Sequence, residues 1–243
     1  MTNKKRERID VRELIRRLES DPEYQKKIAE MERKDPRYYA ALREEDAQVC
    51  AALREVGVEV DSVYDLLEWK KNPDVAIPVL LEWLTRCKVR RIKEGVIRAL
   101  GGPRAGKEVV RALIAVLDDC VAKKEPELCW VLGNAISIAA EPRDFDELLR
   151  LVRDPRYGDA RQMLAMALGR KGAKNKEVAM ETLVALLDDP VVQGHALTGL
   201  RYLRMEASRA AIEPLLSHEK AWIRKGARGA LAALDKARSS SKR

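Results

Sequence analysis

Residues 221–234 read AWIRKGARGALAAL. Apolar or small side chains stand at Ile223, Ala227, Leu231 and Leu234, and this spacing of three to four residues is typical of one face of an α-helix. Most of the polar side chains between them are basic. The stretch therefore predicts an amphipathic helix, and the next question is whether its pattern recurs in the chain.

The pattern occurs five times. We call the residue that corresponds to Leu231 in each copy the repeat anchor, and successive anchors are 36, 32, 32 and 31 residues apart. The residue before each anchor is small, and the residues four and eight before it are apolar or small, which indicates a face that a neighbouring helix approaches closely. The anchors are Leu100, Ile136, Leu168, Leu200 and Leu231.

A second apolar helix pattern precedes each copy. The connections between the helices carry helix breakers and caps, such as DDP at 188–190 and RDPRYGD at 153–159. Residues 71–236 therefore predict five helix–turn–helix units, which bury a continuous core only when they stack. The corresponding positions of the preceding helices are Leu84, Leu117, Val152, Leu187 and Leu216.

The segments LVRDPRYGDARQMLAMALGRKG (151–172) and LLDDPVVQGHALTGLRYL (186–203) resemble HEAT repeats. That family places Asp-Pro in the turn and a basic residue early in the second helix of each unit. The resemblance covers about two-thirds of the chain and implies an all-α, right-handed α-solenoid of about five HEAT-like hairpins. HEAT arrays serve many roles, so the resemblance specifies architecture rather than function. The basic position holds Lys93, Cys129, Arg161, Gln193 and Arg224, so three of five copies match.

Residues 10–70 lack the anchor pattern. The sequence predicts a helix over about 10–32, which SDPE at 20–23 could divide, then a helix over about 36–55 and a short helix over 62–69. We interpret this segment as a helical N-terminal cap, because an uncovered solenoid end exposes core. A degenerate sixth unit is the alternative.

The two ends of the chain are polar. The basic residues 1–9 and the tail 237–243 are predicted to be disordered. No apolar run approaches the roughly 18 residues that cross a bilayer, and no apolar segment follows the charged N-terminus, so we expect a cytoplasmic protein without membrane contact. We expect the cysteines to be free thiols that pack as small apolar residues; they are Cys50, Cys87, Cys120 and Cys129.

Charge differs between the two sets of helices. The whole chain carries +8, the five second-helix segments together carry +11, and the five first-helix segments carry −6. Because second helices line the concave face of HEAT-like arrays, the resemblance implies a positive groove that attracts an anionic ligand. For the copies of the basic position (Lys93, Arg161 and Arg224), an alternative is a structural ladder of ion pairs with turn acids. The candidate contacts are Arg90, Arg91, Lys93, Arg161, Arg201, Arg224, Lys225 and Arg228.

The sequence contains no phosphate-binding loop, dinucleotide fingerprint, serine-nucleophile elbow or zinc-protease motif. The two histidines, His195 and His218, have no evident partner in the sequence. We therefore predict no catalytic residue, metal ligand or cofactor. The sequence favours a non-enzymatic binding or scaffold protein that holds an acidic protein partner in its concave face. Nucleic acid binding through the same groove is the alternative.

One enzymatic form of that alternative concerns alkylpurine DNA glycosylases built from HEAT-like repeats, which use a carboxylate near aromatic side chains in a basic groove. This sequence offers Asp159 with Tyr157, Trp130 and Trp222 on or beside second helices. No glycosylase motif matches residue by residue, and packing between helices is the favoured interpretation of these aromatic residues.

Overall fold

The computed structural model describes residues 17–18, 20–68, 74–102 and 106–240. These residues form an all-α solenoid, and no strand occurs among them. Five hairpins follow one another, as the repeat predicted. They are α4 (Ala76–Arg86) with α5 (Arg90–Leu100), α6 (Lys107–Lys123) with α7 (Pro126–Ala139), α8 (Phe145–Arg153) with α9 (Ala160–Lys171), α10 (Lys176–Ala185) with α11 (Gln193–Leu203), and α12 (Arg209–Ile212) and η7 (Glu213–Ser217) with α13 (Ala221–Ser240).

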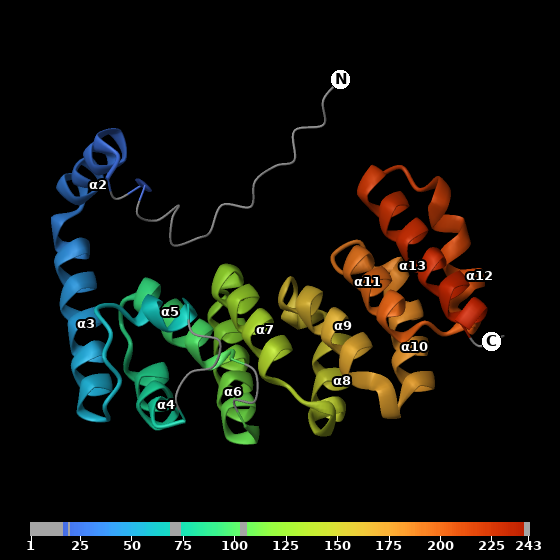
Figure 1. Cartoon of the computed structure of the whole chain (residues 1–243), viewed down its shortest axis with the longest axis horizontal. Coiled ribbons are helices and arrows are strands. Elements are labelled where there is room, and N and C mark those ends of the chain that lie inside the picture. The colour runs from blue at the N-terminus through green and yellow to red at the C-terminus, as the bar shows by residue number, and fades with distance from the viewer. Residues whose placement is uncertain (1–16, 19, 69–73, 103–105, 241–243) are drawn as a thin grey trace.

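The hairpins stand side by side along the long axis of the molecule, and both ends bend toward the same side (Figure 1). Contacts along the array run between second helices: α5 packs on α7, α7 on α9, α9 on α11 and α11 on α13. The second helices α5, α7, α9 and α11 lie nearer the side toward which the ends bend, which we call the concave side.

The core follows the repeat anchors. All five second-helix anchors are buried, and four of the five first-helix positions are buried as well. Leu216 is the exception, with 40% of its surface exposed, whereas Ile212 before it is fully buried. From Glu213 onward the chain tightens into the 3₁₀-helix η7. Because a 3₁₀-helix turns further per residue than an α-helix, Leu216 is rotated away from the core.

Small residues allow the second helices to approach closely, and one of them, Gly199, stands just before its anchor, where the sequence predicted such an approach. A β-carbon added to Gly169 on α9 would lie 2.5 Å from the Cα atom of Gly199 on α11. A β-carbon added to Gly133 on α7 would lie 2.5 Å from the carbonyl oxygen of Ala160 on α9. Real Cβ atoms do not approach other atoms so closely, so glycine is required for these two helix contacts.

The N-terminal helices are α2 (Pro22–Lys34), α3 (Pro36–Glu55) and the 3₁₀-helix η1 (Val63–Glu68). The predicted break at 20–23 is present: the Asp21 carboxylate accepts a hydrogen bond from the Glu23 backbone N–H at 2.9 Å and begins α2. The part of the predicted helix that precedes residue 17 lies outside the described residues. The helix predicted over 36–55 has these same bounds in the structure.

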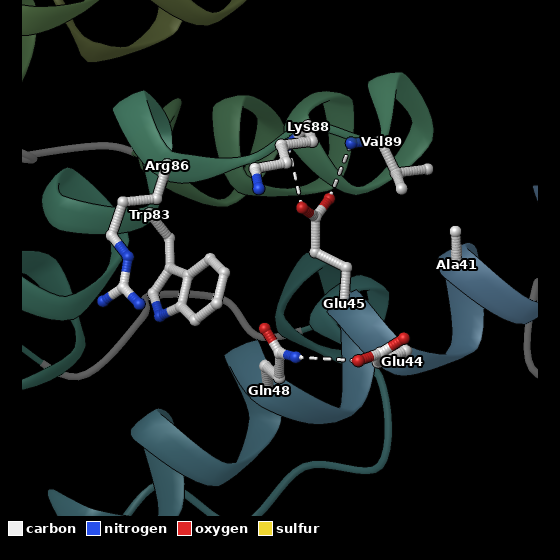
Figure 2. A pocket seen from close by; sticks show the side chains of 8 residues that line it. All are labelled: Ala41, Glu44, Glu45, Gln48, Trp83, Arg86, Lys88 and Val89. Carbon is white, nitrogen blue, oxygen red and sulfur yellow. Dashed lines mark hydrogen bonds between the residues drawn. The ribbon is translucent and has the colours of Figure 1, made fainter.

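A buried carboxylate joins α3 to the array. The two carboxylate oxygens of Glu45 accept hydrogen bonds from the backbone N–H groups of Lys88 and Val89, both at 2.8 Å, where α5 begins (Figure 2). The residue that precedes α5, Val89, cannot cap the helix with its own side chain. Glu45 therefore supplies a cap from another helix: it pairs the N–H group of the N-cap residue Val89, which a helix start leaves unpaired, and the N–H group of Lys88 before it. Meanwhile, η1 packs on α5.

The C-terminal tail was predicted to start too early. Helix α13 continues to Ser240, so residues 237–240 are helical rather than disordered. The hydroxyl groups of Ser239 and Ser240 donate hydrogen bonds to carbonyl groups four residues earlier, at 2.9 and 3.0 Å, which lets these serines remain within the helix. Residues 241–243 and the predicted disordered segment 1–9 lie outside the described residues.

Candidate binding surface

The surface of interest is the part of each second helix that faces the concave side. Along these helices the residues that keep exposed surface recur at intervals of three and four between the buried ones. On α5 these are Arg91, Glu94 and Arg98. The equivalent residues of the other second helices stand at the same distances in sequence from their repeat anchors. Positively charged residues on this surface concentrate in two places, one at each end of the array.

The N-terminal arginine cluster consists of Arg90, Arg91 and Arg98 on α5. With Tyr38, Tyr64, Leu67 and Glu94 they line a cavity of about 510 Å³. The Arg91 guanidinium lies 6.0 Å from the centre of the Tyr64 ring, and the Tyr64 hydroxyl donates a hydrogen bond of 2.7 Å to the Arg91 carbonyl. Tyrosine thus holds one arginine beside an open surface.

Arg90 is less available than its neighbours. Its guanidinium donates to the Glu94 carboxylate at 3.0 Å and forms an ion pair with Glu127 of α7. The hydrogen bonds to these carboxylates raise the pKa of the Arg90 guanidinium above its ordinary value. Arg91 and Arg98 make no ion pair with any residue in the described part of the chain, so they carry the positive charge of this cluster.

The C-terminal basic cluster consists of Arg170 on α9, Arg201 on α11, and Lys225 and Arg228 on α13. The guanidinium carbons of Arg170 and Arg201 lie 5.8 and 6.0 Å from the centre of the Tyr202 ring, which is 41% exposed. The Arg201 guanidinium reaches α13, since a β-carbon added to Gly229 would lie 3.7 Å from it. Within the described ranges, none of the four cations has an ion-pair partner.

The basic position of the repeat serves the fold rather than the surface in two of its three copies. Arg161 is only 4% exposed; its Nε atom donates to the Val152 carbonyl at 2.8 Å, and its Nη1 atom lies 2.7 Å from the Asp189 carboxylate. Arg224 donates two hydrogen bonds of 2.7 Å to the carbonyls of residues 218 and 219. Arg161 thus belongs to the structural ladder of ion pairs with turn acids. The prediction that it contacts a ligand in the groove is wrong, because its side chain is buried.

The third copy, Lys93, is half-buried and lines a cavity of about 220 Å³ between α4, α5, α6 and α7. Asp119 and Lys123 line the same cavity and form an ion pair with each other at 2.7 Å. Lys93 therefore lies within the stack of hairpins, in a cavity that Arg90 of the N-terminal arginine cluster also lines.

Between the two clusters the surface is polar and aromatic rather than basic. The indole N–H of Trp130 on α7 donates to the Gln162 side-chain oxygen on α9 at 3.3 Å. The Gln162 amide in turn donates to Asp159 at 3.1 Å and to the Val191 carbonyl at 3.2 Å. This chain of hydrogen bonds runs from α7 through α9 to the turn that precedes α11, and it fixes the side chains of the middle of the surface.

The aromatic and acidic residues considered for base excision do not form one site. Tyr157 is 5% exposed; its hydroxyl donates to Asp118 at 2.6 Å and accepts from Arg150 at 3.0 Å, and both partners belong to first helices. Asp159 instead bonds to Gln162. Trp222 lies against Gly194 of α11, where a β-carbon would overlap its ring, and remains 54% exposed.

Neither histidine has a catalytic partner among the described residues. The His195 Nδ1 atom is buried without a hydrogen bond there, and burial lowers the pKa of this imidazole, opposed by the nearby Asp159 charge. The His218 Nδ1 atom accepts a hydrogen bond from the Lys220 N–H at 3.1 Å. Across the described ranges, no group of three or more His, Cys, Asp or Glu side chains could hold a metal ion.

A further cavity of about 420 Å³ lies where α3 meets α4 and α5 (Figure 2). Four of its polar side chains are already paired: Glu45 caps α5, Gln48 donates to Glu44 at 3.5 Å, and Arg86 forms an ion pair with Glu82 while lying 4.5 Å from the centre of the Trp83 ring. This cavity is a structural junction, and we assign no ligand to it.

Sequence reasoning missed Arg98, Arg170 and Tyr202 as parts of the surface, and it missed Glu45 as a cap. A signal for the first three was present. Arg98 stands two residues before its anchor, and Arg170 and Tyr202 two residues after theirs, on the side of the helix opposite the buried anchor positions. The cap by Glu45 spans 43 residues of sequence and has no local signal.

Comparison with known proteins adds little to this description. No family model and no curated protein matches the chain. Among solved structures it is similar to an engineered protein (17% identity, 79% of this chain and 97% of that one, TM-score 0.46) and to a designed armadillo repeat protein (14%, 76% and 99%, TM-score 0.42). A second engineered protein gives 18% identity, 76% and 57% coverage and a TM-score of 0.44. At these scores the fold is established by the chain's own helices. No helix within the described residues is long and apolar enough to cross a membrane.

Proposed function

We propose that this chain is a non-enzymatic binding protein with HEAT-like repeats, which holds an extended acidic segment of a protein partner along its concave surface. The observation that supports this proposal is the pair of exposed cation clusters at the two ends of one row of helices. At both clusters an arginine lies beside a tyrosine ring, Tyr64 or Tyr202, which restrains its guanidinium. Restrained and unpaired arginines favour carboxylate binding, because little side-chain freedom is lost on contact.

The middle of the surface favours a protein over a nucleic acid. Asp159 lies there with Trp130 and Gln162, and no cation among the described residues of α7 offsets its carboxylate, whereas Glu127 is paired with Arg90. A phosphate backbone that crossed the array would meet the Asp159 charge and no cation of α7, since nucleic-acid grooves rely on continuous phosphate contacts. A polypeptide can present uncharged side chains to this middle part and acidic side chains to each end.

The spacing of the clusters sets the length of the segment. Helices α5 and α11 are separated by α7 and α9, and packed helices lie about 8–10 Å apart, so the clusters are about 25–30 Å from each other. An extended chain advances about 3.3 Å per residue, so about eight or nine residues bridge them. We therefore expect a ligand with two acidic patches separated by a short uncharged segment.

Fluorescence anisotropy with a labelled peptide tests the proposal. The peptide has about 14 residues, with four glutamates at each end and an uncharged middle, to match this span. Reversal of charge at the C-terminal cluster (Arg201→Glu with Lys225→Glu) should weaken binding by about tenfold or more, since exposed ion pairs are each worth up to about 1 kcal/mol. The matched control is Arg111→Glu, which changes an exposed cation on the first helix α6 and should change the Kd less than about twofold.

A duplex DNA of about 20 base pairs, titrated at the same ionic strength, serves as the competing probe. If it bound more tightly than the peptide, lost affinity in the cluster variant and showed the steep salt dependence of phosphate contacts, nucleic acid would be the ligand and the protein-partner proposal would be wrong. Equal peptide binding by wild type and the cluster variant would also overturn it.

A further inference from the structure

Two cysteines of the second unit lie in direct contact. Cys120 stands in the last turn of α6 and Cys129 in the first turn of α7, and their Sγ atoms are 2.7 Å apart. They are 1% and 6% exposed, respectively. Cys50 and Cys87 are also buried and free; the Cys50 thiol donates to the Asp46 carboxylate at 3.9 Å, and neither sulfur contacts another sulfur among the described residues.

The turn between the helices positions the pair. Helix α6 is followed by Lys124 in the left-handed conformation (φ 58°), and α7 starts at Pro126, so the chain reverses within three residues. The Cys120 thiol also donates to the Glu125 carbonyl at 3.1 Å, which holds it against the turn. Both sulfur atoms are thus fixed by backbone that belongs to one hairpin.

The pair lies where the repeat departs from its own pattern. Cys129 occupies the position that Arg161 fills in the next unit, and Arg161 there forms a buried ion pair with Asp189. The second unit has no cation in this position, so it lacks that connection. Instead, two thiols contact each other across its hairpin.

A small oxidant can reach the pair. Cys120 lines the cavity of about 220 Å³ that Lys93, Lys123 and Glu125 also line. A water molecule takes about 30 Å³ of liquid volume, so this space admits a molecule the size of hydrogen peroxide. The Cys129 sulfur lies directly behind Cys120, so a reaction at one sulfur places the other in position to follow.

We infer that Cys120 and Cys129 are a modification site at which hydrogen peroxide forms a reversible disulfide between α6 and α7. Peroxide oxidises one thiol to a sulfenic acid, and one water leaves. The neighbouring sulfur attacks the sulfenic sulfur, the S–S bond forms, and the hydroxyl leaves as a second water with the remaining thiol proton. Peroxide accepts the two electrons, and a dithiol reductant restores both thiols.

The reaction is expected to be slow at neutral pH. Burial raises the pKa of both thiols above the ordinary value, so little of the reactive thiolate is present at pH 7. The rate should therefore increase with pH. The disulfide closes a loop of about ten residues, and the loss of freedom in the unfolded chain should raise the Tm by about 5 °C.

Mass spectrometry of the peroxide-treated full chain tests the inference. We expect a loss of about 2 Da, a peptide that links Cys120 to Cys129, and two rather than four alkylatable thiols after denaturation. Dithiothreitol should restore all four. Cys129→Ser should lose the linked peptide, whereas a Cys50→Ser control should keep it.

Three results would overturn the inference: four free thiols after prolonged treatment at pH 8, oxidation of Cys120 to sulfinic acid without a link, or a link between Cys120 and Cys87, which lines the same cavity. The wild-type peptide map decides between these results even if Cys129→Ser does not fold.

Discussion

The contact between α9 and α11 is the most stringent test of the stacked fold, and Gly169→Ala perturbs it with a single methyl group. The new Cβ atom would lie 2.5 Å from the Gly199 Cα atom. Favourable carbon contacts need about 3.5–4.0 Å, so the two helices must separate by about 1 Å. The opposing atoms belong to backbone, so no side-chain rotation can relieve the contact.

Two opposing terms set the expected magnitude. Alanine is a better helix former than glycine by about 0.8–1 kcal/mol, which alone would stabilise the variant. Overpacking of a rigid contact costs about 1–3 kcal/mol and more where backbone must move. We expect the contact to dominate and the free energy of unfolding to fall by about 2 kcal/mol, which lowers the Tm by about 4–8 °C for a chain of this size.

The assay is thermal and urea unfolding followed by helical circular dichroism. The matched control is Gly229→Ala on α13, where the added Cβ would meet its nearest atom, in the Arg201 guanidinium, at 3.7 Å. Neither glycine has a positive φ. The control should be stabilised by about 0.5–1 kcal/mol. If Gly169→Ala matched the control, the close stacking of second helices described here would be wrong.

Three further perturbations follow from single contacts. In a urea titration, Arg161→Met should lower the free energy of unfolding by about 2–3 kcal/mol, because it leaves the partly buried Asp189 carboxylate without its partner. Arg156→Met, which removes the exposed ion pair with Asp154, should change the free energy of unfolding by less than about 0.5 kcal/mol. Because burial lowers the pKa of His195, its imidazole binds protons more readily in the unfolded chain than in the folded one. The stability contribution should therefore be fully present above about pH 6.5 and decline below it. His195→Asn should remove that decline in Tm, and an unchanged pH profile would refute the conclusion that buried His195 causes it. Gly194→Val should displace the Trp222 ring and shift tryptophan emission to longer wavelength, which an unaltered spectrum would contradict.

The fold could be predicted from the sequence because the residues that make the contacts between repeat units recur at regular local spacing. The anchor position is apolar in every copy, as at Leu168 and Leu200, because each unit packs on the next. The residue before the anchor Leu200, Gly199, is small because α9 lies against it. The exposure of Leu216 was not predictable in this way. It depends on a local tightening from α-helix to 3₁₀-helix, which the apolar spacing does not encode.

The candidate surface was only partly accessible. Composition indicated that second helices are positive, but whether a cation is exposed depends on the next unit. Arg161 and Arg201 have the same charge and both belong to second helices, yet Asp189 of the following turn binds the first, whereas the second lies in the open beside Tyr202. The contact of Cys120 with Cys129 likewise depends on the geometry of one turn, which the spacing of nine residues does not reveal. That the whole concave surface binds an acidic segment stays a prediction.

Photo-cross-linking can locate both ends of the bound ligand at once, with the acidic peptide that carries four glutamates at each end and a benzophenone at each terminus, followed by mapping of the modified residues. We expect one end to modify residues around Tyr64 and Arg98 and the other end to modify residues around Tyr202 and Arg228, in the same complex. Modification of the first helices α6, α8 and α10, or of one cluster by both ends, would contradict it.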